Sequence, residues 1–513
     1  MKRLRAFLYS KSFNIVFSTI INVVAAVLIT YLFGIAWYLI GCLGFAILIF
    51  LGLIYKNRNC KINFMILQLS IILPLVALTL FRYMTNIRGS KRIRTKYREL
   101  SQLDTGYTAS ENDAVLDTLS KKSILISKTS KYLNATLNAP VYENNSAYFI
   151  SSANKYYEDL SRSLKGAKKY IFIECNKMTD CAVWQNIFQI LKERTFAGVE
   201  IKLLYDDYNS IKAFKDKETF VKLFNHKIET LAFNPLKAGV GRLSQHRNFN
   251  NTIIIDGECA YAGQIGLSNE FVEKSSLGDV PNKKLASAIY VSGDAVTSLT
   301  KNFVINWNLF ASSDALVLEK YLTKVASKSR NKNYIQPFEV TPLIKENVCK
   351  NIQNNLVNCA SNSLWIVTPY MLVGSESKNA LIASARCGVD VNIIVSKNYK
   401  SKWQNDLSYT NYGSLIREGV KIYTIDNTEL ENQIILADNS NLLIGTGNID
   451  SRRMYSPFEN GMLVYSEDIA VSVQQYIAKL LPYCTQLTYK EVKKRKLSSK
   501  LNGALLKIFS PLM

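Results

Sequence analysis

The chain has 513 residues and a formal charge of +23, and 48% of its residues are hydrophobic. This length exceeds one ordinary domain and predicts a membrane segment followed by two globular lobes. The charge suits nucleic acid or an anionic membrane surface, and the apolar runs near the N-terminus favour the membrane. The nine cysteines form no CxxC pair, which argues against a zinc site, so we expect neither a metal nor another cofactor.

Residues 1–85 are predicted to form the membrane segment. Phe13–Phe33 and Trp37–Tyr55 are nearly uncharged, and each is long enough to cross a bilayer. Basic residues precede the first run and follow the second, so both ends of this hairpin are expected in the cytoplasm. The third apolar stretch, Asn63–Phe81, is either an interfacial or re-entrant segment or part of an inverted hairpin, and its topology stays open.

Residues 86–140 are predicted to be a basic juxtamembrane linker. Seven basic and no acidic residues lie between Arg82 and Arg98. A run of this kind is often only solvated, but beside a membrane we expect it to bind anionic headgroups.

The first globular lobe is predicted to cover residues 141–323. Tyr156–Gly166 and Trp184–Ala197 have the apolar spacing of helices, while Tyr170–Glu174 and Val199–Tyr205 read as buried strands.

The second lobe, residues 333–489, repeats that order. Helices are predicted at Val348–Ala360 and Lys378–Cys387, and strands at Leu364–Thr368 and Val389–Val395. The segments GVEIKLLYDD and GVDVNIIVS make the repeat visible. The pattern predicts two repeated α/β lobes with helices covering their sheets.

Each lobe then has a strand that ends in an acid, a turn and a loop of small residues. These segments are Thr252–Gly263 and Ile434–Asp450, and loops of this kind suit phosphate.

Lys324–Lys332 is the expected linker between the lobes. Residues 490–513 combine a basic run with an amphipathic apolar tail, which predicts an interfacial membrane helix; a tail packed on the lobes is the alternative.

The sequence resembles the phospholipase D superfamily, and within it the bacterial cardiolipin synthases. The resemblance runs along nearly the whole chain and is carried by AKKYIFIE, GVEIKLLYDDYNS, IVTPY, GVDVNIIVS, REGVKIY, GTGNIDSRR and FEN. It implies two phospholipase D-like lobes with mixed sheets, each carrying a His, a Lys two residues later and an Asp. One His would attack the phosphodiester, the other would protonate the leaving alcohol, and the lysines would hold the phosphate oxygens.

The chain departs from this pattern at four of its six core positions. Phe249 and Glu431 stand at the histidines, and Asn251 and Gln433 at the lysines. The two aspartates, Asp256 and Asp438, are retained. Phenylalanine cannot transfer a proton and amides cannot neutralise a phosphate, so we expect the standard mechanism to be lost.

Two histidines and several polar residues lie outside the six core positions. His246 lies three residues before Phe249, a large displacement for a nucleophile, and His226 reads as a surface or packing residue. In the loop downstream, Gly266 stands where the family usually has Asn. Without histidine partners, the retained aspartates are expected to accept backbone N–H groups. Phosphate or lipid contacts are also expected from four further residues, namely Arg247, Thr446, Asn448 and Arg452. For the two arginines the equal alternative is a side chain that only faces solvent.

The resemblance thus implies a multi-pass protein of a bacterial cell membrane with its large domain in the cytoplasm. It would be cardiolipin synthase-like and degenerate, and would bind anionic phospholipid such as phosphatidylglycerol or cardiolipin. It could also regulate an active homologue or form a homo-oligomer. The alternatives are an active phosphatidyltransferase that makes cardiolipin with non-standard residues, and a nucleic-acid-binding member, which fits the charge but not the spans.

Overall fold

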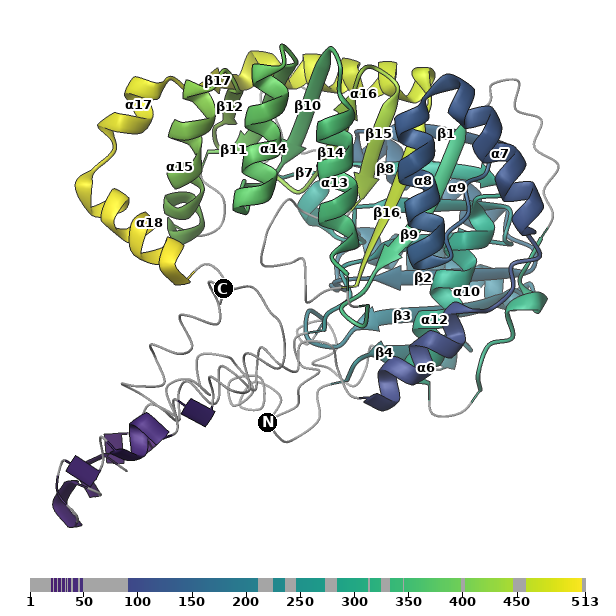
Figure 1. Cartoon of the computed structure of the whole chain (residues 1–513). Coiled ribbons are helices and arrows are strands. Elements are labelled where there is room, and N and C mark those ends of the chain that lie inside the picture. The colour runs from purple at the N-terminus through teal and green to yellow at the C-terminus, as the bar shows by residue number, and fades with distance from the viewer. Residues whose placement is uncertain are drawn as a thin grey trace. The chain divides into compact units, whose positions relative to one another are not determined.

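A computed structural model describes individual positions between residues 20 and 48, and then a series of longer segments. These are residues 91–210, 225–235, 246–272, 284–311, 314–323, 333–344, 346–397, 402–445 and 458–509. Residues 92–235 and 246–507 belong to one compact unit, which contains both lobes (Figure 1).

Lobe one is built on a seven-stranded mixed sheet with the order β1-β8-β6-β5-β2-β3-β4. Its strands are β1 (Asn145–Ile150), β2 (Tyr170–Cys175), β3 (Glu200–Asp206), β4 (Glu229–Phe233), β5 (Asn251–Ile255), β6 (Cys259–Gly263) and β8 (Ala288–Gly293). Its helices are α9 (Ala153–Lys165), α10 (Ala182–Phe196) and α12 (Val296–Phe310), with short 3-10 turns η1 (Asn269–Phe271) and η2 (Leu318–Lys320).

Lobe two is built on an eight-stranded sheet with the order β17-β12-β11-β10-β14-β15-β16-β9. Its strands are β9 (Tyr334–Val340), β10 (Ser363–Thr368), β11 (Asp390–Ser396), β12 (Lys421–Ile425), β14 (Gln433–Ala437), β15 (Asn441–Gly445), β16 (Glu459–Tyr465) and β17 (Cys484–Gln486). Its helices are α13 (Val348–Cys359), α14 (Ser375–Arg386), α15 (Lys402–Arg417) and α16 (Glu467–Leu480), with the turn η4 (Leu481–Tyr483).

The two sheets share one strand order, apart from the extra edge strand β17. In both lobes the central strand runs parallel to one neighbour and antiparallel to the other: β2 pairs with β3 and β5, and β10 with β11 and β14. The predicted repeat of α/β lobes is confirmed, because short continuous apolar runs specify the buried strands and helical spacing specifies the covering helices. The predicted inter-lobe linker at residues 324–332 lies outside the described residues.

One apolar core is common to both lobes. It includes α12 and α16 together with Ile254 of β5 and Ile434 of β14. Within it Phe172 stacks on Phe303 of α12 with ring centroids 4.4 Å apart. The other sides of the sheets have separate cores, under α9 and α10 in lobe one and under α13 in lobe two. The central strands of the two lobes therefore border the same buried layer.

The segment before lobe one corrects a prediction. Residues 86–140 were expected to be a linker, but they include the helices α6 (Lys91–Ser101), α7 (Ala109–Lys122) and α8 (Ile124–Leu137). Thr108 and Glu111 form a capping box that starts α7. Leu116 and Leu133 are buried in the core of lobe two, so α7 and α8 are part of the folded unit.

The N-terminal part is described only in pieces. The described positions from 20 to 48 are helical except Gly34, whose φ of +86° ends the first helix. Among the residues that the structure describes, no helix has both the length and the apolar character needed to span a bilayer. Much of the two predicted spans and all of Asn63–Phe81 lie outside the described residues.

Candidate functional site

Asp256 directly follows strand β5 and holds the start of the central strand β2. Its carboxylate accepts hydrogen bonds from the backbone N–H groups of Lys168 at 2.8 Å, Lys169 at 2.7 Å and Tyr170 at 2.9 Å. Asp256 has a φ of +56°, a left-handed conformation that aspartate tolerates at a hairpin turn. Its side chain therefore fixes the backbone at the junction of two strands.

Asp438 does the same in lobe two. Its carboxylate accepts from the backbone N–H groups of Ser361 at 2.7 Å, Asn362 at 2.7 Å and Ser363 at 3.1 Å, and its φ is +50°. Both aspartates thus have the backbone-accepting role that we expected of them. Asp256 and Asp438 lie at equivalent places in the two lobes. Residues at the same distance before each aspartate in the sequence are therefore equivalent as well.

Phe249 and Glu431 are equivalent in this comparison, seven residues before each aspartate. The Phe249 N–H donates to the Phe458 carbonyl of lobe two at 3.0 Å, and the Glu431 N–H donates to the Leu285 carbonyl of lobe one at 2.8 Å. The second contact extends a two-stranded parallel sheet of β7 (Lys284–Leu285) and β13 (Glu429–Leu430). Each motif segment is therefore bonded to the opposite lobe, and both lie along the boundary between lobes.

Asn251 and Gln433, at the expected lysine positions, are both held among protein atoms. The Asn251 Oδ1 accepts from the Asn176 N–H at 3.2 Å and lies against Gly266, where an added Cβ would be 3.4 Å from it. Gln433 is 1% exposed and lines a small pocket with Glu459. Its amide has no hydrogen-bond partner in the part of the chain that the structure describes. The two amides thus have different surroundings.

Arg247 is buried and directed into lobe one. Its guanidinium lies 3.7 Å from the Asp206 carboxylate and donates to the Asn234 carbonyl at 2.9 Å. Burial lowers the pKa of Arg247 although Asp206 opposes this, and burial raises the pKa of Asp206 although Arg247 opposes it. Phosphate binding by Arg247 stays a prediction. Thr446, Asn448 and Arg452 lie outside the described residues.

The two histidines lie in different surroundings. His246 is buried beside the motif segment, and its carbonyl accepts from the Asn234 side chain at 2.9 Å. His226 makes edge contacts with Phe188 and Phe196 of α10, at centroid distances of 5.8 and 6.3 Å. The packing role expected for His226 agrees with these contacts.

Sequence reasoning missed a polar network that joins the lobes. The Glu174 carboxylate on β2 accepts from the side-chain amides of Asn248 at 2.6 Å and Asn306 at 2.9 Å. The Glu339 carboxylate on β9 accepts from Asn250 and Asn306, each at 2.7 Å. The Asn250 Oδ1 in turn accepts from the backbone N–H of Asn460 at 2.6 Å. Asn250 lies between Phe249 and Asn251, so this network lies next to the motif positions.

Glu174 and Glu339 are two acids in one buried network. Burial raises the pKa of Glu174 to about 7 against the effect of its amide partners. Burial, and then the charge of Glu174, raise the pKa of Glu339 to about 8. Ionising both neighbouring carboxylates costs free energy, because their buried negative charges repel each other. The folded pair therefore retains protons that exposed glutamates release.

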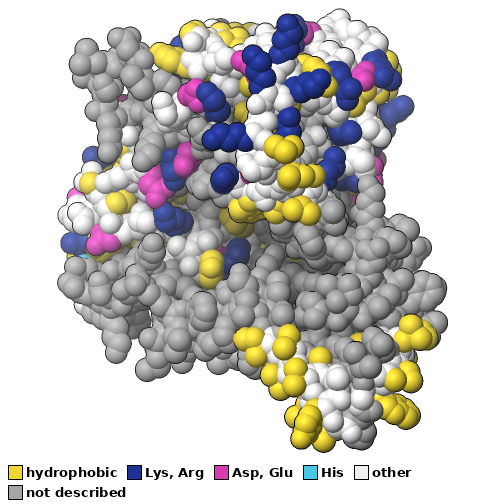
Figure 2. Space-filling model, turned by 90° about the vertical axis from the view of Figure 1, so that its left-hand side faces the viewer, with side chains coloured by type: hydrophobic (Ala, Val, Ile, Leu, Met, Phe, Trp, Pro, Cys, Tyr) yellow, Lys and Arg dark blue, Asp and Glu magenta, His cyan; other side chains and the backbone are white. Residues whose placement is uncertain are grey.

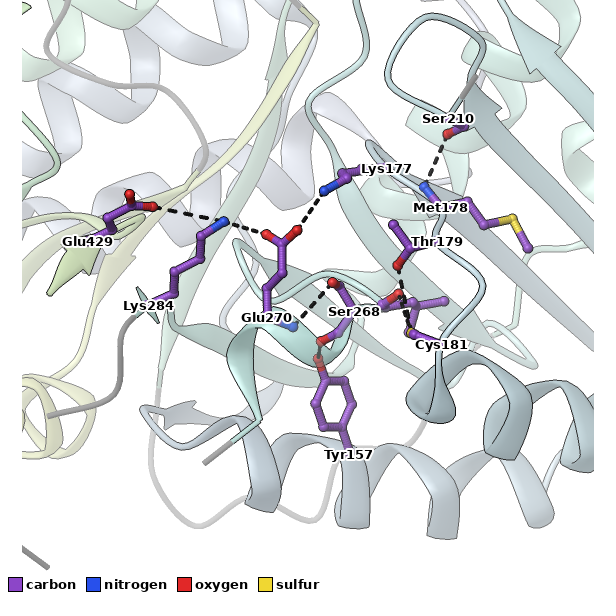
Figure 3. Close-up of polar contacts among 11 residues, drawn as sticks. Tyr157, Lys177, Met178, Thr179, Cys181, Ser210, Ser268, Glu270, Lys284 and Glu429 are labelled. Atoms are coloured by element: carbon purple, nitrogen blue, oxygen red, sulfur yellow. Dashed lines mark hydrogen bonds and ion pairs between the residues drawn. The ribbon is translucent and has the colours of Figure 1, made fainter. Parts of the chain in front are cut away.

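A chain of ion pairs crosses the lobe boundary near β7 and β13 (Figure 3). Lys177 lies 2.7 Å from Glu270, Lys284 bonds the same carboxylate, and Lys284 is 4.0 Å from Glu429 of lobe two. Partial burial raises the pKa of Glu270, but the two lysines outweigh it and lower that pKa to about 2. Lys177, which follows β2, and Lys284 on β7 are thus paired with the same carboxylate.

Comparisons with known proteins agree with this architecture. Residues 354–481 match the family described as cardiolipin synthase, PLD-like domain. A cardiolipin synthase of Clostridium perfringens is 28% identical over 73% of this chain and 79% of its own length. Cardiolipin synthase 1 of Staphylococcus aureus is 27% identical over 72% and 74%. An uncharacterized protein of Streptococcus mutans is 26% identical over 75% and 82%.

A solved structure supports the fold independently. The phosphatidylserine synthase of Haemophilus influenzae superposes with a TM-score of 0.57 at 13% identity, covering 75% of this chain and 96% of its own. At this identity the likeness concerns the fold alone. The two lobes of equal strand order, the domain model that matches residues 354–481 and the related sequences along most of the chain together support a cardiolipin synthase-like protein of the phospholipase D superfamily.

Proposed function

We propose that this protein is a cardiolipin synthase-like member that has lost the two-histidine reaction and binds anionic phospholipid at a bacterial cell membrane. One observation carries the proposal. Phe249 and Glu431 occupy equivalent backbone positions, each bonded across the lobe boundary and each seven residues before a backbone-capping aspartate. This equivalence supports the assignment of both positions to the histidines of the family.

The surrounding charges also argue against phosphodiester chemistry. Phosphoryl transfer needs fixed cations against the charge that develops in the transition state. Lys177 and Lys284 share Glu270, and Arg247 is paired with Asp206. These cations are therefore partly neutralised by carboxylates of the protein before any substrate arrives.

Two further roles belong to the proposal. Exposed apolar side chains in the N-terminal segment, among them Val27, Tyr31 and Trp37, support an anchor in the membrane. The large domain would then lie on the cytoplasmic side. With the two-lobed fold of the family but not its nucleophile, the protein would bind phosphatidylglycerol or cardiolipin or regulate an active homologue.

Turnover and binding should be measured on the same preparation. The full chain is reconstituted into vesicles containing labelled phosphatidylglycerol, with the cardiolipin synthase of Staphylococcus aureus assayed in parallel. We expect the relative to form cardiolipin and this chain to form none, while the chain binds anionic vesicles more tightly than phosphatidylcholine vesicles. Cardiolipin formation that is lost on His246→Ala would overturn the proposal.

The second candidate is an active phosphatidyltransferase with non-standard acids. It is favoured by the carboxyl groups of Glu174 and Glu339, because their pKa values of about 7 and about 8 would suit proton transfer. Both side chains are buried in hydrogen bonds with asparagines, however, which opposes contact with a lipid. Turnover that disappears in Glu174→Gln and persists in His246→Ala would select this candidate.

A further inference from the structure

The C-terminal helix α18 (Leu497–Phe509) is held tightly against α15. Gly503 of α18 lies so close to α15 that an added Cβ would be 2.5 Å from the Asp406 carbonyl oxygen and 2.9 Å from the Thr410 methyl group. Only glycine permits this approach without a shift of one helix. The orientation of α18 about its own axis is therefore fixed by its contact with α15.

A buried carboxylate reinforces this contact. The Asp406 side chain is 1% exposed; it pairs with the Arg495 guanidinium at 2.6 Å and accepts from the Asn502 amide at 2.8 Å. Arg495 also lies over the Tyr409 ring, 4.0 Å from its centroid. The face of α18 that meets the protein thus carries Asn502, Gly503 and Leu506, and Leu506 packs against the small cluster around Leu407.

The opposite face of α18 is apolar and exposed. Leu497, Leu501 and Leu505 are 70%, 56% and 57% exposed. They recur every four residues, so they form one stripe along the helix. This arrangement is the reverse of a helix that serves a protein core, where the apolar stripe faces inward. The stripe lies outside the contacts that hold α18 on α15.

Basic residues surround the leucine stripe. Between residues 489 and 509 the sequence has one acid, Glu491, and that side chain caps the start of α17 (Tyr489–Lys494) by bonding Thr488. The exposed cations of the segment are Lys490, Lys493, Lys494, Lys496, Lys500 and Lys507. Figure 2 shows hydrophobic side chains close to a concentration of Lys and Arg side chains on the side of the molecule that carries α17 and α18.

We propose that α17 and α18 form a docking surface for an anionic lipid bilayer, with α18 lying in the membrane interface and its leucine stripe among the acyl chains. Lysines beside an apolar stripe match the negative headgroups and the apolar interior that a bilayer presents together. A second copy of the chain would bring one basic surface against another, which charge repulsion opposes. The proposal does not depend on the motif positions, which lie elsewhere in the fold.

Tryptophan quenching tests this surface in the full chain. In a Trp37→Phe background, Leu501→Trp is reconstituted into vesicles whose lipids carry bromine on the acyl chains. Phe196→Trp is the matched control, because Phe196 is also an exposed hydrophobic side chain, 81% exposed, but is on α10 of lobe one. We expect roughly twofold quenching of the added tryptophan at position 501 in phosphatidylglycerol vesicles, and little at position 196.

Charge provides the second arm. Replacing Lys493, Lys494, Lys496 and Lys500 with Gln should remove most of the quenching at position 501, because each lysine near an anionic surface contributes about fivefold to partitioning. These side chains and the leucines are exposed, so thermal unfolding should stay that of the parent, which checks folding. Absence of quenching in anionic vesicles would overturn the proposal. A blue shift of the tryptophan emission without quenching would overturn it as well, because it would show that a protein surface covers position 501. Either result leaves the assay of cardiolipin formation unaffected.

Discussion

The two lobes have the same backbone at their motif segments but different side chains around them. In lobe one, Glu174 stands on β2 four residues after the strand start that Asp256 holds. In lobe two the equivalent residue on β10 is Val367, which is fully buried in the common core. Lobe one therefore has a polar centre where lobe two has an apolar one.

The difference shows which parts of the motif serve the fold. Asp256 and Asp438 each hold three backbone N–H groups, so their loss would disturb two strands at once. Phe249 and Glu431 contribute backbone N–H groups to the opposite lobe, and any residue except proline supplies these. The side chains at Phe249 and Glu431, where the family has histidines, can thus change without loss of the fold.

The largest expected effect tests the polar centre of lobe one. Asn306→Ala removes the amide that bonds both Glu174 and Glu339, and should lower the free energy of unfolding by about 3 kcal/mol, because it leaves buried acids with fewer donors. Asn302→Ala on the same helix is the control, since the Asn302 amide nitrogen has no partner among the described residues. Equal effects of the two changes in urea unfolding would contradict this account.

The aspartates test the equivalence of the lobes themselves. Asp256→Ala should cost about 3 kcal/mol and Asp438→Ala about 2 kcal/mol, since each change removes three hydrogen bonds and puts alanine at a positive φ. Asp256 is the more buried of the two, which explains the order. Thermal unfolding of both variants measures the difference. An undisturbed Asp256→Ala protein would show that the shared geometry is not what stabilises the strands.

The acidic pair, with Glu174 in lobe one and Glu339 in lobe two, predicts a pH dependence that arises where the lobes meet. Since the folded pKa values of Glu174 and Glu339 are raised, the folded protein holds protons that the unfolded chain releases above about pH 4.5. The free energy of unfolding contributed by the pair is therefore greatest at low pH and falls as the pH rises toward 8.

Glu339→Gln isolates this effect. The variant should match the parent in urea unfolding at pH 5 and exceed its free energy of unfolding by about 1–2 kcal/mol at pH 8, because glutamine cannot ionise. A difference between the two proteins that is constant with pH would refute the buried proton. Glu158→Gln, at an exposed position, changes the net charge by the same amount and is the control.

The smallest effect is expected at Gly266, where the family usually has asparagine, and at its neighbour Asn251, where the family has lysine. Gly266→Asn restores the residue usual in the family, and its Cβ would lie 3.4 Å from the Asn251 Oδ1. Only a slight shift of Asn251 is needed, so the loss of stability should stay below about 1 kcal/mol. A larger loss in thermal unfolding would mean that Asn251 and Gly266 are fitted to each other.

Much of the fold follows from local sequence patterns. The helix predicted at Val348–Ala360 and the strand predicted at Leu364–Thr368 lie within one residue of α13 and β10. The turn aspartates were also assigned correctly, because an acid at the end of a β-branched strand such as TIIID marks a hairpin.

What could not be predicted depends on contacts distant in sequence. Glu174 sits in the apolar run YIFIEC, and its network requires Glu339 from the other lobe. The helices α7 and α8 were not predicted, because their charged residues made the apolar face hard to recognise in the sequence. The spacing of Thr108 and Glu111 is nevertheless that of a capping box. The lysine pairs around Glu270 also depend on segments brought together only by folding.

The bonds between lobes have a consequence for synthesis of the chain. The Phe249 N–H needs the Phe458 carbonyl, and Asn250 needs Glu339 and Asn460, all of which leave the ribosome after lobe one is complete. In a nascent lobe one, the Phe249 N–H and the Asn250 side chain therefore lack these partners, and Glu174 lacks Glu339. Its final hydrogen bonds form only when residue 460 has been translated, so the two lobes mature together and a fragment ending between them is expected to aggregate.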